Sequence, residues 1–328
     1  DEGKEVWRYS YSSKVKRNHG MSRTVPAVSG DYLVTLGPKC DVHCFHPMTG
    51  ELYWEKDLVK EYGTRVPEWY AGQCPLIEKD RVILAPGGKC LLTAIDLATG
   101  DTIWETPNDQ NWDMTHVSIV PYEFEGEKHY AWCATGGALG VNAETGKLLW
   151  THPDWQIKIA NIPSPVDVGG GKIFLSGGYN AGSEMLQILK TDSGYTADSV
   201  FKTEPTVFGS DQQTPILLNG FLYGVIPGGK LACLDLSGNQ QWVDEENLFG
   251  LGPYMAINGK LLVLDDNEKK PGELTLFDVS PQGATRIAGW KVIEGHDAWA
   301  PMAYAGGKLV LRDATTLICM QLAEGNAI

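Results

Sequence analysis

Several features that would point to particular classes of protein are missing from this sequence. No apolar run approaches the roughly 20 residues that a membrane-spanning helix needs. Basic residues are outnumbered, and the formal net charge of −14 argues against nucleic acid or an anionic membrane surface as the main partner. No segment has convincing helical periodicity, so an all-β fold is favoured.

The cysteines form no recognisable pattern. There are seven, an odd number, and their scattered positions predict no disulfide framework. The chain has no Cys-Cys dipeptide and no C-x-x-C-H motif for haem attachment. The first residues, DEGKEVW, contain no signal-peptide core, and we interpret them as a mature or trimmed N-terminus. Hydrophobic residues make up 43% of the 328 positions, which is enough for a substantial core.

What the sequence does have is an internal repeat. The segment AIDLATGDTIW at 94–104 has two close relatives, CFHPMTGELYW at 44–54 and GVNAETGKLLW at 140–150, and a shorter one, CLDLSGNQQW at 233–242. Tryptophans at 7, 54, 104, 150, 242 and 290 are separated by 47, 50, 46, 92 and 48 residues. One period of about 47 residues therefore runs through the chain, with the tryptophan missing once, near residue 196.

Each period also contains short apolar segments separated by glycine-rich turns, as in VPAVSGDYLVTL at 25–36 and TPILLNGFLYGV at 214–225. Four short strands in a period of this length are typical of a β-propeller blade. We therefore predict an all-β propeller of four-stranded antiparallel blades, formed by residues 1–328 as a single domain. Seven blades fit the length, or eight if an upstream blade was trimmed. The N-terminal strand with Trp7 is expected to complete the last blade and close the ring.

The repeated motif has a structural interpretation. The tryptophan is expected to pack on the neighbouring blade, the Thr-Gly pair to form a tight turn, and the Asp or Asn to accept hydrogen bonds from turn amides. A role in proton transfer would not survive the exchange of Asp for Asn and His between copies, as at His46. The predicted docking residues are Trp7, Trp54, Ala94, Asp96, Thr99, Gly100, Trp104, Asn142, Gly146, Trp150, Asp235 and Trp242.

Two other motifs favour ordinary structural roles. PGGK at 86–89 recurs at 227–230, and neither copy has the Ser or Thr and the following helix of a phosphate-binding loop, so both are predicted to be hairpin turns. CDVHCFH at 40–46 has the density of a metal site. On a strand, however, two residues four apart lie ~13 Å from each other, so we expect inter-blade packing and no metal site there. His129 and His152 are isolated.

Residues that precede the innermost strand of each blade are expected to line one mouth of the central funnel, where a ligand would bind. A ring of amide, imidazole and guanidinium donors with aromatic walls suits a small polar molecule, a carbohydrate or a protein segment. The alternative is that these groups cap strand starts and hold channel water. The candidates are Arg23, Trp69, Tyr70, Gln73, Trp112, His116, Asn161, Gln213, His296 and Trp299.

The pattern A-x-D-x-x-T-G-x-x-x-W, matched by residues 94–104, resembles the tryptophan-docking motif of the pyrroloquinoline-quinone (PQQ) repeat propellers. The resemblance covers nearly the whole chain, and residues 56–72 are similar to secreted bacterial members. That superfamily includes quinoprotein alcohol dehydrogenases and non-enzymatic members such as the lipoprotein scaffold of the outer-membrane protein assembly machinery. The resemblance implies a bacterial, periplasmic or otherwise extracytoplasmic protein. Fold alone does not decide its function.

Three functions are compatible with these observations. The enzymes of the family typically carry a Cys-Cys disulfide over the quinone, which this chain cannot form, so the leading hypothesis is a non-catalytic scaffold that binds a ligand or protein at its funnel face, with no cofactor. A PQQ- and calcium-dependent alcohol or sugar dehydrogenase is the first alternative. The second is a polysaccharide-active lyase or hydrolase, for which His116 or His296 would be the acid–base group.

Overall fold

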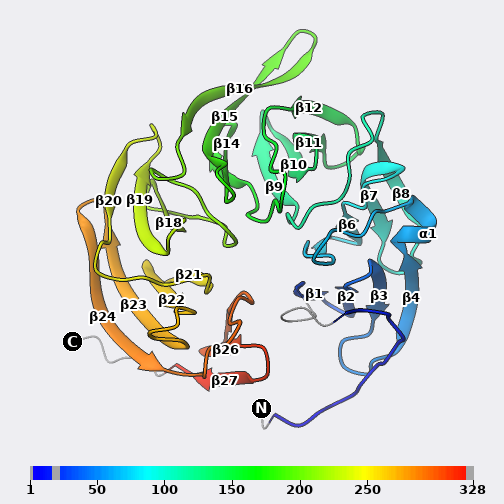
Figure 1. Ribbon diagram of the computed structural model, residues 1–328. Coiled ribbons are helices and arrows are strands. Elements are labelled where there is room, and N and C mark those ends of the chain that lie inside the picture. The colour runs from blue at the N-terminus through cyan, green and yellow to red at the C-terminus, as the bar shows by residue number, and fades with distance from the viewer. Residues whose placement is uncertain (1–2, 17–22, 323–328) are drawn as a thin grey trace. The chain divides into compact units, whose positions relative to one another are not determined.

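The computed structural model describes residues 3–16 and 23–322, in which almost all regular structure is β-strand (Figure 1). Seven antiparallel sheets follow one another along the chain, and each is built from strands that are consecutive in sequence. The fold is a seven-bladed β-propeller, as predicted from the repeat. We number the blades one to seven in chain order.

Blade one contains β1 (Ala27–Ser29), β2 (Tyr32–Leu36), β3 (Asp41–Phe45) and β4 (Leu52–Asp57). Blade two contains β5 (Leu76–Glu78), β6 (Arg81–Leu84), β7 (Cys90–Asp96) and β8 (Thr102–Pro107). Blade three contains β9 (Val120–Phe124), β10 (Glu127–Ala134), β11 (Gly137–Asn142) and β12 (Leu148–His152). Blade four contains β13 (Val166–Gly169), β14 (Lys172–Gly177), β15 (Gly182–Thr191) and β16 (Gly194–Thr203).

Blade five contains β17 (Ile216–Leu218), β18 (Phe221–Ile226), β19 (Lys230–Asp235) and β20 (Gln240–Val243). Blade six contains β21 (Tyr254–Ile257), β22 (Lys260–Leu264), β23 (Glu273–Ser280) and β24 (Gly283–Lys291). Blade seven contains β25 (Ala303–Ala305), β26 (Lys308–Arg312) and β27 (Leu317–Gln321).

The contacts group these blades into two compact units. The first comprises Asp1–Leu175 and Met185–Val200, and the second comprises Ser176–Glu184 and Phe201–Ile328. Within each unit, the first strands of consecutive blades lie next to each other. The neighbouring pairs are β1 with β5, β9 with β13, and β17 with β21. The prediction of a single domain over 1–328 stays a prediction.

Burial explains the strand pattern within a blade. In blade two, every residue of β6 and nearly every residue of β7 is buried, because a middle strand is covered on both faces. The outer strand β8 alternates between exposed and buried residues, with Trp104 and Thr106 facing inward. Continuous apolar runs followed by an alternating Trp-bearing strand are therefore the sequence pattern of one blade.

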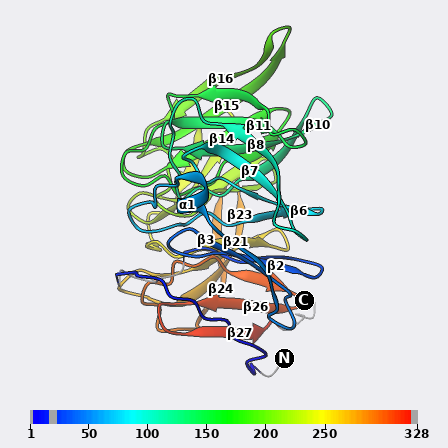
Figure 2. The same cartoon turned by 90° about the vertical axis from the view of Figure 1, so that its right-hand side faces the viewer.

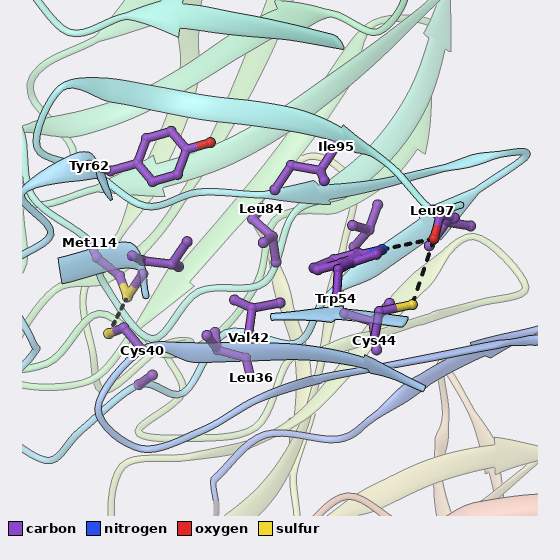
Figure 3. Packing of buried hydrophobic residues seen from close by; sticks show 14 of the residues in the cluster. Leu36, Cys40, Val42, Cys44, Trp54, Tyr62, Leu84, Ile95, Leu97 and Met114 are labelled. Carbon is purple, nitrogen blue, oxygen red and sulfur yellow. Dashed lines mark hydrogen bonds between the residues drawn. The ribbon is translucent and has the colours of Figure 1, made fainter. Parts of the chain in front are cut away.

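The repeated motif closes the contact between one blade and the next. Gly100 in the turn of blade two has a φ of +76°, and a Cβ there would lie 2.8 Å from the Trp54 ring of blade one. Trp54 is 8% exposed, and its Nε1 donates a hydrogen bond to the Leu97 carbonyl at 2.8 Å (Figure 3). Asp96 Oδ1 accepts two backbone hydrogen bonds of 2.9 Å inside the same turn. We call this arrangement the clasp.

The clasp recurs at other blade contacts. A Cβ on Gly50 would lie 2.5 Å from Trp7, and one on Gly146 would lie 2.5 Å from Trp104. At Gly238, in blade five, the neighbouring ring is Phe201, 2.8 Å from such a Cβ. Phe201 therefore occupies the place of the tryptophan that the repeat lacks.

The polar half of the clasp is also repeated. His46 Nδ1, Asn142 Oδ1 and Asp235 Oδ1 each accept hydrogen bonds from two backbone N–H groups of the turn that follows, at 2.8–3.2 Å. Three residue types thus serve one position because each offers an acceptor at the same distance from the turn.

The N-terminal arm, residues 3–16, is extended but forms no regular strand. Alternate aromatic residues face blade one: Trp7 lies 5.6 Å from the Phe45 ring, Tyr9 lies 4.8 Å from it, and Tyr11 lies 4.5 Å from the His43 ring. Trp7 Nε1 also donates to the Pro47 carbonyl at 2.8 Å. Trp7 therefore docks on blade one as Trp54 docks on blade two.

Blade seven differs from the other six. It has three strands, and the described residues of the N-terminal arm add no fourth strand to it. The position of its clasp turn, after the third strand β27, lies outside the described residues. Trp290, on the outer strand β24 of blade six, is 51% exposed.

The remaining sequence motifs have plain structural roles. The PGGK segments form the turns between β6 and β7 and between β18 and β19, as predicted. Cys40 and Cys44 lie in the core between blades one and two, where burial raises the pKa of each thiol to about 12. Cys40 Sγ lies 3.8 Å from Met114 Sδ (Figure 3).

Helix α1 (Leu58–Tyr62) follows blade one and packs against β3 and β4 (Figure 2). Asp57 caps its first turn by accepting a hydrogen bond from the Lys60 amide at 3.1 Å. Gly63, with a φ of 67°, ends the helix in the left-handed conformation. The chain is thereby turned into a loop, residues 63–75, that runs to β5.

Candidate functional site

The loop 63–75 is held down at both ends and bulges in the middle. Thr64, Ala71 and Gln73 are buried, and the Ala71 amide donates to the Pro38 carbonyl at 3.1 Å. Between these anchors, the Tyr70 amide donates to the Pro67 carbonyl at 2.9 Å and closes a turn. Tyr70 has a φ of 71°, a conformation that is uncommon for a residue other than glycine. The turn presents two adjacent aromatic side chains, Trp69 and Tyr70.

This turn forms most of the wall of a cavity of about 470 Å³, within the usual range of roughly 300–1,000 Å³ for ligand sites. We call it the 66–70 pocket. Its lining residues are Lys16, Lys39, Val66, Pro67, Glu68, Trp69 and Tyr70.

Two contacts fix Tyr70 in the pocket wall. Its hydroxyl accepts a hydrogen bond from the Lys16 amide at 2.7 Å and donates one to the Lys16 carbonyl at 3.1 Å. The Lys39 ammonium lies 5.0 Å from the centre of the Tyr70 ring, within the range of a cation–π interaction. The N-terminal arm, the loop and the turn before β3 therefore meet at one phenol ring.

His116 lies beneath the same turn. A Cβ on Gly72 would lie 2.8 Å from the imidazole, so the loop can approach His116 this closely only with glycine there. Burial, with the positive charge of Arg23 as the second cause, lowers the pKa of His116 to about 4, while a hydrogen bond to the Tyr70 backbone acts in the opposite direction. His116 is thus a neutral imidazole at pH 7.

Asn161 is joined to His116 through the backbone, because the His116 amide donates to the Asn161 carbonyl at 3.1 Å. Asn161 is 3% exposed, and neither atom of its side-chain amide has a hydrogen-bond partner among the described residues. Buried amides of this kind are ordinarily satisfied by an ordered water or another small polar group. Of the predicted funnel residues, Arg23, Tyr70, His116 and Asn161 are therefore brought together, with Trp69 next to them in the pocket.

Other predicted site residues have structural partners. Gln73 was expected to face a ligand, but it is fully buried, and its amide exchanges two 2.8 Å hydrogen bonds with the Ala85 backbone. Its amide therefore joins loop to blade, and this corrects the prediction. Trp112 covers Gly136, where a Cβ would lie 2.0 Å from the indole nitrogen.

The second unit holds the last three candidates. Gln213 Nε2 donates to the Leu251 and Trp299 carbonyls, both at 3.2 Å, and the cavity beside Gln213 has a volume of about 10 Å³, enough for a single water. Trp299 Nε1 donates to an Asp266 carboxylate oxygen. The His296 side chain is 85% exposed, and its Nδ1 lies 3.5 Å from Asp297. The Gln213 Nε2 is therefore bonded within the protein, and a role of this residue in ligand binding stays a prediction.

Two lining residues of the pocket were missed by the sequence reasoning. Lys16 belongs to the N-terminal arm and Lys39 to a turn before β3, so neither precedes the first strand of a blade. Lys16 lies among several basic residues near the start of an acidic chain, which is a weak signal, whereas Lys39 is the only Lys or Arg between Arg23 and Lys56 and had no such signal.

Comparison with known proteins gives a consistent result. A family model described as outer membrane protein assembly factor BamB matches residues 1–244. The crystal structure of BamB from Moraxella catarrhalis superposes with a TM-score of 0.66 at 14% identity, covering 93% of this chain and 84% of that one. The computationally designed Ika8 protein superposes with a TM-score of 0.54 at 8% identity, covering 93% and 97%. At these identities the two structures show the fold alone. No curated protein sequence matches the chain.

Two further observations concern the described residues only. No group of three or more His, Cys, Asp or Glu side chains among them could hold a metal ion. Within residues 3–16 and 23–322, no helix is long and apolar enough to cross a membrane.

Proposed function

Because this chain belongs to the family of the outer membrane protein assembly factor BamB, we propose that it is a non-catalytic scaffold of the bacterial cell envelope that holds a protein partner at the 66–70 pocket. The observation that carries the proposal is the pocket itself. Aromatic and aliphatic side chains and two lysines surround a ligand-sized cavity on a loop that is anchored at both ends. An extracytoplasmic location follows from the same family membership.

The chemistry around the pocket supports binding over catalysis. His116 is the imidazole that bonds to the backbone of Tyr70 in the pocket wall. Its pKa of about 4 keeps it neutral at pH 7, far from the value at which a general acid works best. Its hydrogen bond to the Tyr70 backbone holds the turn in place. His116 is therefore a positioning residue in this proposal.

The PQQ repeat family also raises the question of a quinone and calcium. Calcium takes six to eight oxygen ligands, largely carboxylates and carbonyls. The residues joined to His116 by charge or by backbone hydrogen bonds are Arg23, Tyr70 and Asn161, and none of them carries a carboxylate. These residues do not fit a calcium–quinone pair, and no step of the proposed function uses one.

The proposal is tested by site-specific photo-cross-linking in native host cells. A benzophenone amino acid replaces Glu68, exposed at the pocket, and in a matched variant replaces Glu105, exposed on the outer strand β8. We expect a discrete adduct from position 68, with a cell-envelope protein identified in it by mass spectrometry, and no such adduct from position 105. Equal labelling from both positions, or none from position 68, would overturn the proposal. So would dye-linked alcohol oxidation after addition of PQQ and calcium.

A further inference from the structure

The charge of the 66–70 pocket is opposite to that of the chain. On the basis of the proposed function, we propose that the pocket binds an extended segment of the partner protein in which one carboxylate lies next to a large apolar or aromatic side chain. The ligand class follows from two lysines and an aromatic wall that share one cavity.

The lysines supply an uncompensated positive charge. Other basic side chains near the loop are paired: Lys56 lies 3.2 Å from Glu61, Lys60 lies 2.8 Å from Asp57, and Arg65 lies 3.1 Å from Asp113. Among the described residues, by contrast, no carboxylate lies within 4.0 Å of the Lys16 or Lys39 ammonium group. An incoming carboxylate would therefore meet two ammonium groups without displacing an existing ion pair.

The charge pattern of the sequence agrees with this pocket. Residues 6–30 contain five Lys or Arg and no Asp or Glu, in a chain whose net charge is −14. The N-terminal region is thus positive within an acidic protein, and an acidic segment would be attracted to it and repelled by most of the remaining surface.

The wall of the pocket sets the second requirement. Val66, Pro67 and Trp69 are half-buried, so each leaves apolar surface open in the pocket. Buried aromatic contacts dominate the affinity of most protein interfaces. A carboxylate without an apolar neighbour would leave this wall uncovered, whereas an aromatic neighbour would bury it.

Glu68 limits how acidic the ligand is. It is exposed and contributes the only carboxylate among the lining residues, so the pocket has two positive charges and one negative charge. A segment with several consecutive acidic residues would be repelled by Glu68. The balance therefore favours a single carboxylate.

The test uses fluorescence anisotropy with a defined probe, the fluorescein-labelled peptide Gly-Ser-Phe-Asp-Phe-Gly-Ser-Gly. Three matched peptides replace Asp by Asn, both Phe by Ala, or both changes together. The protein variants are Lys39→Gln, its charge-preserving partner Lys39→Arg, and Trp69→Ala. The control is Lys147→Gln, which removes the same charge from an exposed lysine of the same unit. Thermal melts establish that each variant is folded.

We expect the Asn peptide and Lys39→Gln each to weaken binding about 5-fold, and Trp69→Ala to weaken it about 10-fold or more. Lys39→Arg and Lys147→Gln should leave affinity within about 2-fold of the wild type. Raising the salt concentration should weaken binding of the Asp peptide and spare the Asn peptide, because exposed charges are screened. Equal binding of the Asp and Asn peptides, or an equal effect of Lys39→Gln and Lys147→Gln, would overturn the proposal.

The two proposals fail separately. If none of the peptides binds while position 68 still cross-links a partner, the ligand class is wrong and the scaffold function stands. If the Asp peptide binds as expected but no cross-link forms in cells, the pocket chemistry stands and the proposed function is wrong.

Discussion

Trp54 and Trp290 both belong to the repeat of about 47 residues, but they lie at different registers of their blades. In blade one, Trp54 is the outer-strand residue paired directly before the bulge, and it is 8% exposed and docks on Gly100. In blade six, Ala288 has that place. Trp290 lies two residues further along β24, is paired with Leu274 and is 51% exposed. Docking of the tryptophan therefore depends on the register of the outer strand and not on spacing in the sequence alone.

The largest expected effect is on Trp54. Trp54→Ala removes a buried ring from the core between blades one and two and should lower the free energy of unfolding by about 3–5 kcal/mol. Trp290→Ala, the same change on a half-exposed ring, should cost less than about 1 kcal/mol. Urea denaturation followed by circular dichroism measures both. Equal losses of unfolding free energy for the two variants would mean that docking in the clasp contributes nothing to stability beyond what a half-exposed tryptophan contributes.

Glycine substitution tests which part of the clasp admits the ring. Gly100 and Gly126 have nearly the same backbone conformation, with φ values of +76° and +73°, but a Cβ on Gly126 would meet no atom within 4 Å. Gly126→Ala should therefore cost about 1–2 kcal/mol from backbone strain alone. Gly100→Ala should cost about 2–4 kcal/mol, because it also forces Trp54 out of contact. If the two variants shift the urea midpoint equally, the close approach of the Trp54 indole is not what requires glycine at position 100.

A pair of histidines extends the comparison to pH. The lowered pKa of His116, about 4, means that the unfolded chain binds a proton at pH 5 while the folded protein does not. Stability should therefore fall as the pH drops from 7 toward 5, by up to about 2 kcal/mol from this group. His116→Gln should flatten that slope. His296→Gln should leave it unchanged, because the His296 side chain is 85% exposed. Denaturation midpoints measured at pH 5, 6 and 7 give the three slopes, and parallel slopes for all three proteins would contradict this assignment.

The smallest expected effect is that of the cap. Asp96 caps the clasp turn of blade two, whereas Asp313 Oδ1 accepts hydrogen bonds from the Thr315 and Thr316 amides at 2.9 and 2.7 Å in the hairpin turn between β26 and β27. Asp96→Ala and Asp313→Ala should each cost about 1 kcal/mol, because each removes the acceptor for two turn amides. Asp96→Asn should be close to neutral, since Asn142 serves the same position in blade three. Thermal melts are sensitive enough to rank these variants. A large loss for Asp96→Ala with none for Asp313→Ala would mean that the cap contributes to tryptophan docking in the clasp.

The blades could be predicted from the sequence because every copy repeats the same local requirements. A positive φ calls for Gly100, and an acceptor two residues before a turn amide calls for Asp96 or its equivalents. Phe201 escaped the search because a smaller aromatic ring fulfils the same packing role at a shifted spacing. The fourth strand expected in blade seven is not formed by the described residues of the N-terminal arm, although Trp7 docks as the repeat requires.

The candidate site was harder to predict because it lies where the repeats differ. Tyr70 and His116 were found from their places before the first strands, but Gln73, in an equivalent place, is bonded to the Ala85 backbone. Residues at equivalent positions before the first strand can thus be turned inward or outward by contacts that the spacing does not encode. Lys16 and Lys39 reach the pocket only through tertiary packing, so no local pattern could assign them to it.

The paired hydrogen bonds between the Tyr70 hydroxyl and the Lys16 backbone couple attachment of the N-terminal arm to binding in the 66–70 pocket. One wall of the pocket belongs to the N-terminal arm and the other to the loop 63–75, so detachment of the arm would take the pocket apart. A ligand that contacts both walls therefore binds more tightly when the arm is attached, and it stabilises the attached arm in turn. Linkage requires the two free-energy changes to be equal. In the occupied protein, the arm becomes a segment whose protection from proteolysis and hydrogen exchange reports on the ligand.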